Sequence, residues 1–333
     1  MRRLIFIALS FMGSAFLLWL VLRDVPFAEV IAGIQQADVL WLIITFVFIT
    51  LSLTTRGVRW RALVENRVPQ REAFLLMSVT MMLNQLPLRA GEVARSAIAT
   101  RYNVPFFTSL TTIVIERILD LLAVVIVISF ALPLAPGATP EAGRAALTLG
   151  VAALVGFGVL IFFARYPQIP RDILARLNRW LPFLERLPLA RLLENVLQGL
   201  QPLTRWDRFA HAVGWTAIAW AVSFLSLYTL ARALALPPES WWLVAFLGVG
   251  FTALGLALPL SVASLGPFQA ALAFAGQLLL LDPVTAITLG FLFNGMAVLG
   301  YVFWGTIGLF SLGLSLGDVF SAQPQPAPAP TSD

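Results

Sequence analysis

Apolar stretches long enough to cross a bilayer recur from one end of this 333-residue chain to the other. Hydrophobic residues make up 59% of the sequence, and charged residues make up only 12%. A helix needs about 20 mainly apolar residues to cross the hydrocarbon core of a membrane. The sequence therefore predicts an all-α fold, that of a polytopic helical membrane protein.

The basic residues lie mostly between the apolar stretches, which limits the partners. The net charge is +5, and all 22 basic residues are arginine. They are spread over the connections and form no single basic domain. The charge therefore indicates membrane orientation and contact with anionic head groups, and nucleic acid is not expected as a partner.

The placement of arginine also predicts the orientation. Arg2 and Arg3 precede the first predicted span, Leu4 to Leu22, which is too long for a signal peptide and lacks a cleavage site. The connection after residue 55 is basic, and the region 165–208 holds eight arginines against four acidic residues. Under the positive-inside rule, we expect a multi-pass protein of the cell (inner) membrane with a cytoplasmic N-terminus.

Two apolar stretches are interrupted by proline and glycine. Phe74 to Tyr102 contains Pro87 and Gly91, and Trp241 to Leu281 contains Pro259. Broken helices at membrane depth are tolerated only where protein or a water-filled cavity surrounds them. We predict two re-entrant helical hairpins that enter from opposite sides as an inverted repeat, as in many secondary transporters.

The two halves around these hairpins have the same order of segments. Leu-Pro-Leu occurs at 86–88 and at 258–260, which fits a repeat, although the tripeptide also occurs at 132–134 and 187–189, so coincidence stays open. Unbroken spans are expected at 39–55, 104–132, 209–230 and 284–316.

A single integral membrane domain is expected over residues 1–320. Within it, residues 165–208 contain two leucine-rich amphipathic stripes, which favour short helices on the cytoplasmic membrane surface. Residues 321–333 alternate proline with small residues, and we expect this tail to be disordered.

The candidate functional residues begin with three charges in the span 104–132. Glu116, Arg117 and Asp120 lie near the middle of this stretch. Each charge at mid-bilayer costs about 2.5–3.5 kcal/mol, so a partner, a wet cavity or a ligand is implied. Pairing of Arg117 with Asp120 leaves one carboxylate in surplus unless Arg89, Arg95 or Arg101 approaches. Glu116 then either carries a proton coupled to transport or belongs to a compensated network.

The first hairpin supplies a second group of charges. Arg89, Glu92 and Arg95 follow Pro87 at spacings of three, so a helix that resumes there presents them on one face. Two guanidinium groups near a helix N-terminus suit an anion such as phosphate, and the alternative is an ordinary interfacial arginine cluster.

The second hairpin offers only neutral groups. Ser264 and Gln269 can contact a head group through a hydroxyl and an amide. Asn84 is a weaker candidate for ligand binding. It serves equally well as a polar contact between helices.

The residue inventory argues against several enzyme classes. There is no lysine for a Walker A motif, one histidine and no cysteine, so multi-histidine and thiolate metal sites cannot form. We expect no catalytic residue, metal or cofactor. A membrane-embedded transferase with Glu92 or Glu116 as base is a lesser alternative.

Two motifs carry a family resemblance. Leu86-Pro-Leu-Arg-Ala-Gly-Glu-Val-Ala-Arg95 followed by Ile115-Glu-Arg-Ile-Leu-Asp120 resembles the signature of the lysylphosphatidylglycerol synthase transmembrane-region, or flippase-like, family. Leu258 to Ala270 resembles its second signature, but neutral Gln269 stands where an acidic residue is common, which weakens an ionic role for the second hairpin.

The resemblance implies a membrane domain associated with translocating modified phospholipids or, in other members, with lipid-linked sugar pathways. We expect no soluble aminoacyl-transferring domain after the proline-rich tail, so synthase activity is not carried over. We expect a flippase-like protein that binds and translocates an anionic phospholipid or lipid-linked precursor through a polar intramembrane cavity. The alternative is a non-transporting lipid-binding scaffold for a partner glycosyltransferase or other lipid-modifying enzyme.

Overall fold

The computed structural model describes residues 2–23, 25–86, 90–180, 189–257 and 264–314, and this part of the chain is helical and contains no strand. The all-α prediction is confirmed. Its α-helices are α1 (Arg2–Leu22), α2 (Phe27–Gln36), α3 (Val39–Leu63), α4 (Gln70–Leu83), α5 (Ala90–Ala99), α6 (Phe106–Ala131), α7 (Pro140–Arg165), α8 (Gln168–Trp180), α9 (Leu189–Leu200), α10 (Trp206–Ala233), α11 (Trp241–Ala257), α12 (Pro267–Leu278) and α13 (Pro283–Ser311).

Local sequence signals explain where several of the long helices begin. The side chain of Asp38 accepts a hydrogen bond from the Leu40 amide at the start of α3, and Asp282 accepts one from the Thr285 amide at the start of α13. Thr139 caps α7 in the same way. These side chains satisfy amide groups that have no partner within the helix.

Four helices are long and apolar enough to cross a membrane: α3, α7, α10 and α13. α6 has 26 residues, and its charges at Glu116, Arg117 and Asp120 set it apart from these four. The predicted spans at 39–55, 104–132, 209–230 and 284–316 correspond to α3, α6, α10 and α13. The protein is therefore a polytopic helical membrane protein.

The two interrupted stretches each form a pair of shorter helices. The first pair is α4 and α5, with 14 and 10 residues, and the second is α11 and α12, with 17 and 12 residues. All are shorter than the roughly 20 residues of a typical span. Pro87 and Pro259 lie outside the described residues, and the re-entrant path of each pair stays a prediction.

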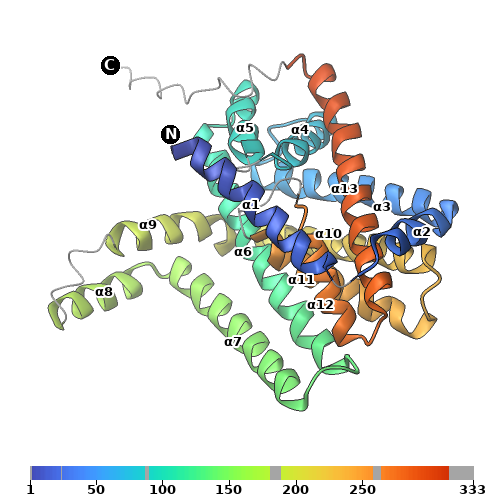
Figure 1. Ribbon diagram of the computed structural model, residues 1–333. Helices are drawn as coiled ribbons and strands as arrows, with labels where there is room; N and C mark the ends of the chain where they lie inside the picture. Colours follow the sequence, from blue (N-terminus) through green and yellow to red (C-terminus); the bar gives the residue numbers. More distant parts are fainter. Residues whose placement is uncertain (1, 24, 87–89, 181–188, 258–263, 315–333) are drawn as a thin grey trace.

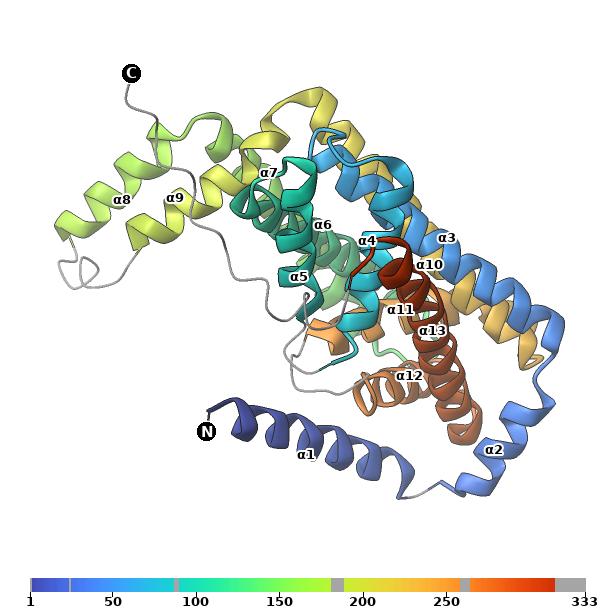
Figure 2. The same cartoon turned by 90° about the horizontal axis from the view of Figure 1, so that it is seen from above.

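Contacts between distant helices form the core of the molecule (Figures 1 and 2). α3 packs against α10, α4 packs against α13, and α11 packs against α6. The α3–α10 pair is antiparallel, because Glu65 contacts Arg208 at one end and the Asp38 amide contacts the Ala233 carbonyl at the other. Near the Asp38–Ala233 end, the hydroxyls of Thr45 and Thr229 are 2.8 Å apart.

α7, α8 and α9 form an arm beside this core (Figure 1). The predicted amphipathic helices are present as α8 and α9. Arg171 on α8 binds Glu194 on α9 with N–O distances of 2.7 and 2.9 Å, and this hydrogen bonding lowers the pKa of Glu194 from its ordinary value of 4.5. Leu197 and Leu200 are buried, so α9 uses part of its apolar stripe to pack on α6 and α7. The predicted tail at 321–333 lies outside the described residues.

Candidate functional site: an ionic network beside a cavity

The three charges of α6 point toward neighbouring helices. Glu116 and Asp120 are one helical turn apart, and their side chains are only 4% and 14% exposed. Arg117 is 41% exposed. Buried charges of this kind require partners, because their desolvation is costly.

Arg59 on α3 is the main partner of Asp120, and the sequence analysis missed it. Its two terminal nitrogens donate to the two carboxylate oxygens of Asp120 at 2.7 and 3.3 Å, and its Nε lies 3.7 Å from Glu116. Arg59 also donates to the hydroxyl of Thr216 on α10. The predicted span ended at residue 55, but α3 continues to Leu63, so Arg59 belongs to a helix and not to a connection. The stretch 56–63 contains no proline, which fits a helix that continues past residue 55.

Arg95 on α5 is the main partner of Glu116. The two groups are 2.6 Å apart and almost completely buried. The guanidinium also lies against the sulfur of Met77 and over the ring of Trp60, at 5.1 Å from its centroid. Of the three arginines that the sequence offered as partners of Glu116, Arg95 forms the ion pair. Glu116 is therefore part of a compensated network.

A further ion pair joins α5 to α6. Arg117 donates to Glu92 at 2.5 Å, and its other terminal nitrogen lies 3.9 Å from Asp120. Glu92 and Arg95 share the face of α5 that meets α6, as their spacing predicted. Arg89 lies outside the described residues.

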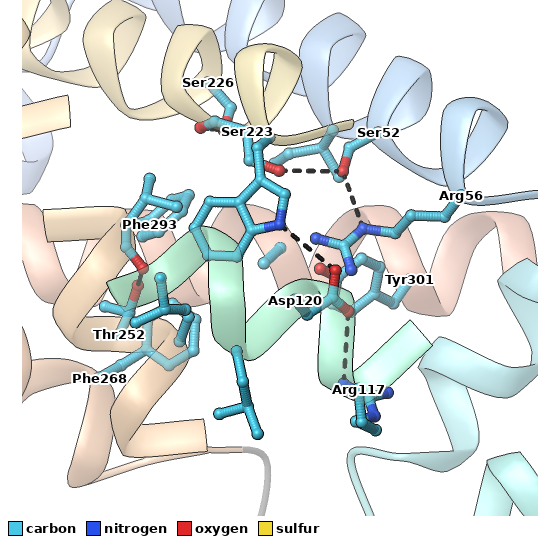
Figure 3. A pocket seen from close by; sticks show the side chains of 17 residues that line it. Ser52, Arg56, Arg117, Asp120, Ser223, Ser226, Thr252, Phe268, Phe293 and Tyr301 are labelled. Carbon is cyan, nitrogen blue, oxygen red and sulfur yellow. Dashed lines mark hydrogen bonds and ion pairs between the residues drawn. The ribbon is translucent and has the colours of Figure 1, made fainter. Parts of the chain in front are cut away.

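A cavity of about 160 Å³ opens beside this network, between side chains of α3, α6, α10, α11, α12 and α13 (Figure 3). Its apolar walls include Val249, Phe268 and Phe293. The polar groups that line it are Ser52, Arg56, Arg117, Asp120, Trp220, Ser223, Ser226, Thr252 and Tyr301. Arg56, which the sequence analysis placed in a connection, is therefore a cavity residue.

The charges around the cavity do not cancel. Among the described residues, the guanidinium groups are those of Arg56, Arg59, Arg95 and Arg117, and the carboxylates are those of Glu92, Glu116 and Asp120. Four positive charges against three negative charges leave one in excess. Arg56 forms no ion pair within 4 Å in the described part of the chain; its Nε donates to the Ser52 hydroxyl, and its charge acts on the Asp120 carboxylate that lines the same cavity.

The neutral candidates lie away from the cavity. Gln269 is fully buried, and its side-chain oxygen accepts from the Gly266 amide, which caps α12. Ser264 precedes this cap with a φ of 57°. Asn84 ends α4, and its buried side-chain oxygen has no hydrogen-bond partner in the described part of the chain.

The guanidinium groups at this site are able to bind an anion. Within the described ranges, no group of three or more histidine, cysteine, aspartate or glutamate side chains could hold a metal ion. The cavity combines arginine, hydroxyl groups and aromatic walls between the helices of a membrane protein. Such a cavity suits a polar group that enters from the membrane together with an apolar body.

Comparison with known proteins places this architecture in a family. No curated protein and no solved structure matches the chain. The sequence profile described as "Lysylphosphatidylglycerol synthase TM region" matches residues 5–305, which covers the network, the cavity and most of the chain. The chain therefore belongs to the lysylphosphatidylglycerol synthase TM region family.

Proposed function

We propose that this protein is a flippase-like transporter that binds the head group of an anionic phospholipid or lipid-linked precursor in the central cavity. The observation that carries this proposal is the excess of one guanidinium charge around a cavity between the helices of a membrane protein. A net positive charge is expensive inside a bilayer, and an anionic ligand reduces that cost.

The contacts between helices support an inverted repeat that surrounds this cavity. In such a repeat, α3, α4, α5 and α6 of the first half are equivalent to α10, α11, α12 and α13 of the second half. The contact between α4 and α13 is then equivalent to the contact between α11 and α6, and α3 packs on its own equivalent, α10. A two-fold relation requires this reciprocity. In the proposed mechanism, the hairpins α4–α5 and α11–α12 gate the cavity alternately, as broken helices do in many transporters.

The arginines support a cytoplasmic N-terminus and a location in the cell membrane. Arg67 and Arg208 both bind Glu65, and Arg165 contacts the Thr204 carbonyl, so arginines from distant segments gather at one end of the helices. This end is cytoplasmic under the positive-inside rule. The proposed activity is transport and not catalysis.

Reconstituted vesicles with labelled anionic or polyprenyl-phosphate lipids test the proposal. Ala253→Trp fills the cavity from α11 and is expected to abolish translocation, because Ala253 lines it. Leu254→Trp is the matched control, because its side chain is 40% exposed and lies outside the cavity lining. Equal activity in both variants, or no protein-dependent movement of any lipid, would contradict the proposal.

The scaffold alternative predicts a different result. It requires stable co-purification of a lipid-modifying enzyme and no lipid movement by the purified protein. Its dock would be the α9 stripe, yet Leu197 and Leu200 are already buried within the protein. This observation favours the transporter.

A further inference from the structure

A second hollow lies at the end of the helices where Glu65 binds Arg208, and it is called here the end groove. Its lining residues belong to the segments 63–67, 104–115 and 204–208. We infer that the end groove binds the phosphate of an anionic phospholipid from the adjacent leaflet. This inference goes beyond the proposed function, because the end groove and the central cavity share no lining residue among the described residues.

The end groove lies at the depth of lipid head groups. The last turn of α3 and the first turn of α10 both contribute to its lining. Phe107 and Trp206, the sequence neighbours of the lining residues Thr108 and Arg205, are exposed. An exposed tryptophan at the end of a membrane-spanning helix is typical of the head-group region of a bilayer. A phospholipid in the adjacent leaflet therefore has its phosphate at the level of the groove.

The end groove carries more arginine than acid. Its lining holds three guanidinium groups, those of Arg67, Arg205 and Arg208. In the described part of the chain, the one carboxylate of the lining is that of Glu65. Arg67 and Arg208 both bind this carboxylate, at 3.0 and 2.7 Å. Arg205 pairs with Asp207 beside the groove, so one positive charge remains in excess when both acids are counted.

The guanidinium groups keep nitrogen atoms that a ligand can use. Arg208 binds Glu65 through one terminal nitrogen, and Arg205 binds Asp207 through Nε and one terminal nitrogen. The Thr108 hydroxyl also lines the groove and makes no hydrogen bond within the described ranges. Guanidinium donors bind phosphate oxygens strongly, and a hydroxyl adds a further donor.

The floor of the end groove indicates that the phosphate belongs to a lipid and not to free phosphate. Val64, Val104 and Ile115 line the groove and are almost completely buried. These side chains gain nothing from an inorganic anion, whereas the apolar part of a lipid is removed from water against them. The volume of about 540 Å³ lies within the roughly 300–1,000 Å³ of sites for drug-sized ligands, so a phosphate and its glycerol fit.

The test measures the lipid that the purified full-length protein retains, by native mass spectrometry. Ala253→Trp is the starting protein, because this substitution fills the central cavity and lies outside the end groove. The probes are phosphatidylglycerol and diacylglycerol with the same acyl chains, which lacks the phosphate. We expect at least about tenfold stronger retention of phosphatidylglycerol.

Two further substitutions in this starting protein locate the bound lipid. Arg205→Gln should weaken the retention of phosphatidylglycerol about tenfold. Arg144→Gln is its matched control, because Arg144 is also exposed and paired with a nearby carboxylate but does not line the groove. Thr111→Trp fills the groove without a change of charge and should weaken retention as well. Its control is Val114→Trp, at an exposed position of the same helix outside the lining.

Equal retention of the two lipids, or unchanged retention of phosphatidylglycerol in Arg205→Gln and Thr111→Trp, overturns the inference. Inorganic phosphate that raises the thermal unfolding midpoint as much as phosphatidylglycerol does overturns the lipid assignment. Neither measurement depends on transport. Failure of the inference is therefore distinguishable from failure of the proposed function, which is decided by lipid movement in vesicles.

Discussion

At the scale of single residues, Arg95 and Glu116 determine how α5 meets α6. Their side chains are 2% and 4% exposed, at a distance of 2.6 Å. Both residues could be selected from the sequence, because charges in an apolar stretch require partners. The choice of partner could not, since Arg89, Arg95 and Arg101 were equally available to Glu116 by spacing.

Loss of one partner of this pair is expected to be costly. Arg95→Met leaves Glu116 buried with Arg59 at 3.7 Å as its nearest cation, so we expect a loss of about 3 kcal/mol in unfolding free energy. Denaturant unfolding of the solubilised protein, followed by tryptophan fluorescence, measures the change. The double variant Arg95→Met/Glu116→Leu should recover part of the loss.

An exposed ion pair provides the control for this prediction. Arg144 and Glu141 are 76% and 75% exposed, so Arg144→Met should cost less than about 1 kcal/mol. Equal losses in Arg95→Met and Arg144→Met would show that burial does not determine the strength of the Arg95 contact.

At the scale of elements, the close packing of α5 on α4 depends on Gly91. A Cβ atom at this position would lie 2.1 Å from the Thr80 carbonyl oxygen and 2.7 Å from the side-chain oxygen of Asn84. The sequence marked Gly91 as part of the break between the two helices. Only the packed structure shows that the glycine is needed for close approach.

Gly91→Ala is therefore expected to separate α5 from α4 and to destabilise the protein by about 1–3 kcal/mol. The variant should also weaken lipid retention, because α5 holds Arg117 through Glu92. Gly158→Ala in α7 is the matched control, since a Cβ atom there meets nothing within 4 Å. A thermal unfolding midpoint of Gly91→Ala that equals that of the control would refute the role of this contact.

Across the whole molecule, the antiparallel pair α3–α10 contacts both pairs of shorter helices, since α3 packs on α4 and α10 packs on α11. Each of the two pairs, α4–α5 and α11–α12, also contacts the opposite half of the chain. The proposed gating requires the hairpins to move relative to the α3–α10 pair. Because the natural sequence has no cysteine, introduced cysteine pairs report on single contacts.

Cross-linking tests which parts move. Thr45→Cys/Thr229→Cys joins α3 to α10, where the native hydroxyls are 2.8 Å apart, and should leave translocation in vesicles unchanged. Phe74→Cys/Trp304→Cys, joined by a short thiol reagent, ties α4 to α13 and should stop translocation, which returns on cleavage of the reagent. Retained transport with α4 tied to α13 would refute gating by the first hairpin.

The membrane setting, the helical class, the approximate positions of α3, α6, α10 and α13 and the need for partners around Glu116, Arg117 and Asp120 could be predicted from the amino-acid sequence. These features depend on local composition, because hydrocarbon excludes polar backbone and isolated charge regardless of the detailed packing. The contacts of Arg59 with Asp120 and of Arg95 with Glu116, and the position of Arg56 at a cavity, emerge only from the packed helices. Pairing between helices depends on their relative rotation and distance, and these arise from the packing of the whole core.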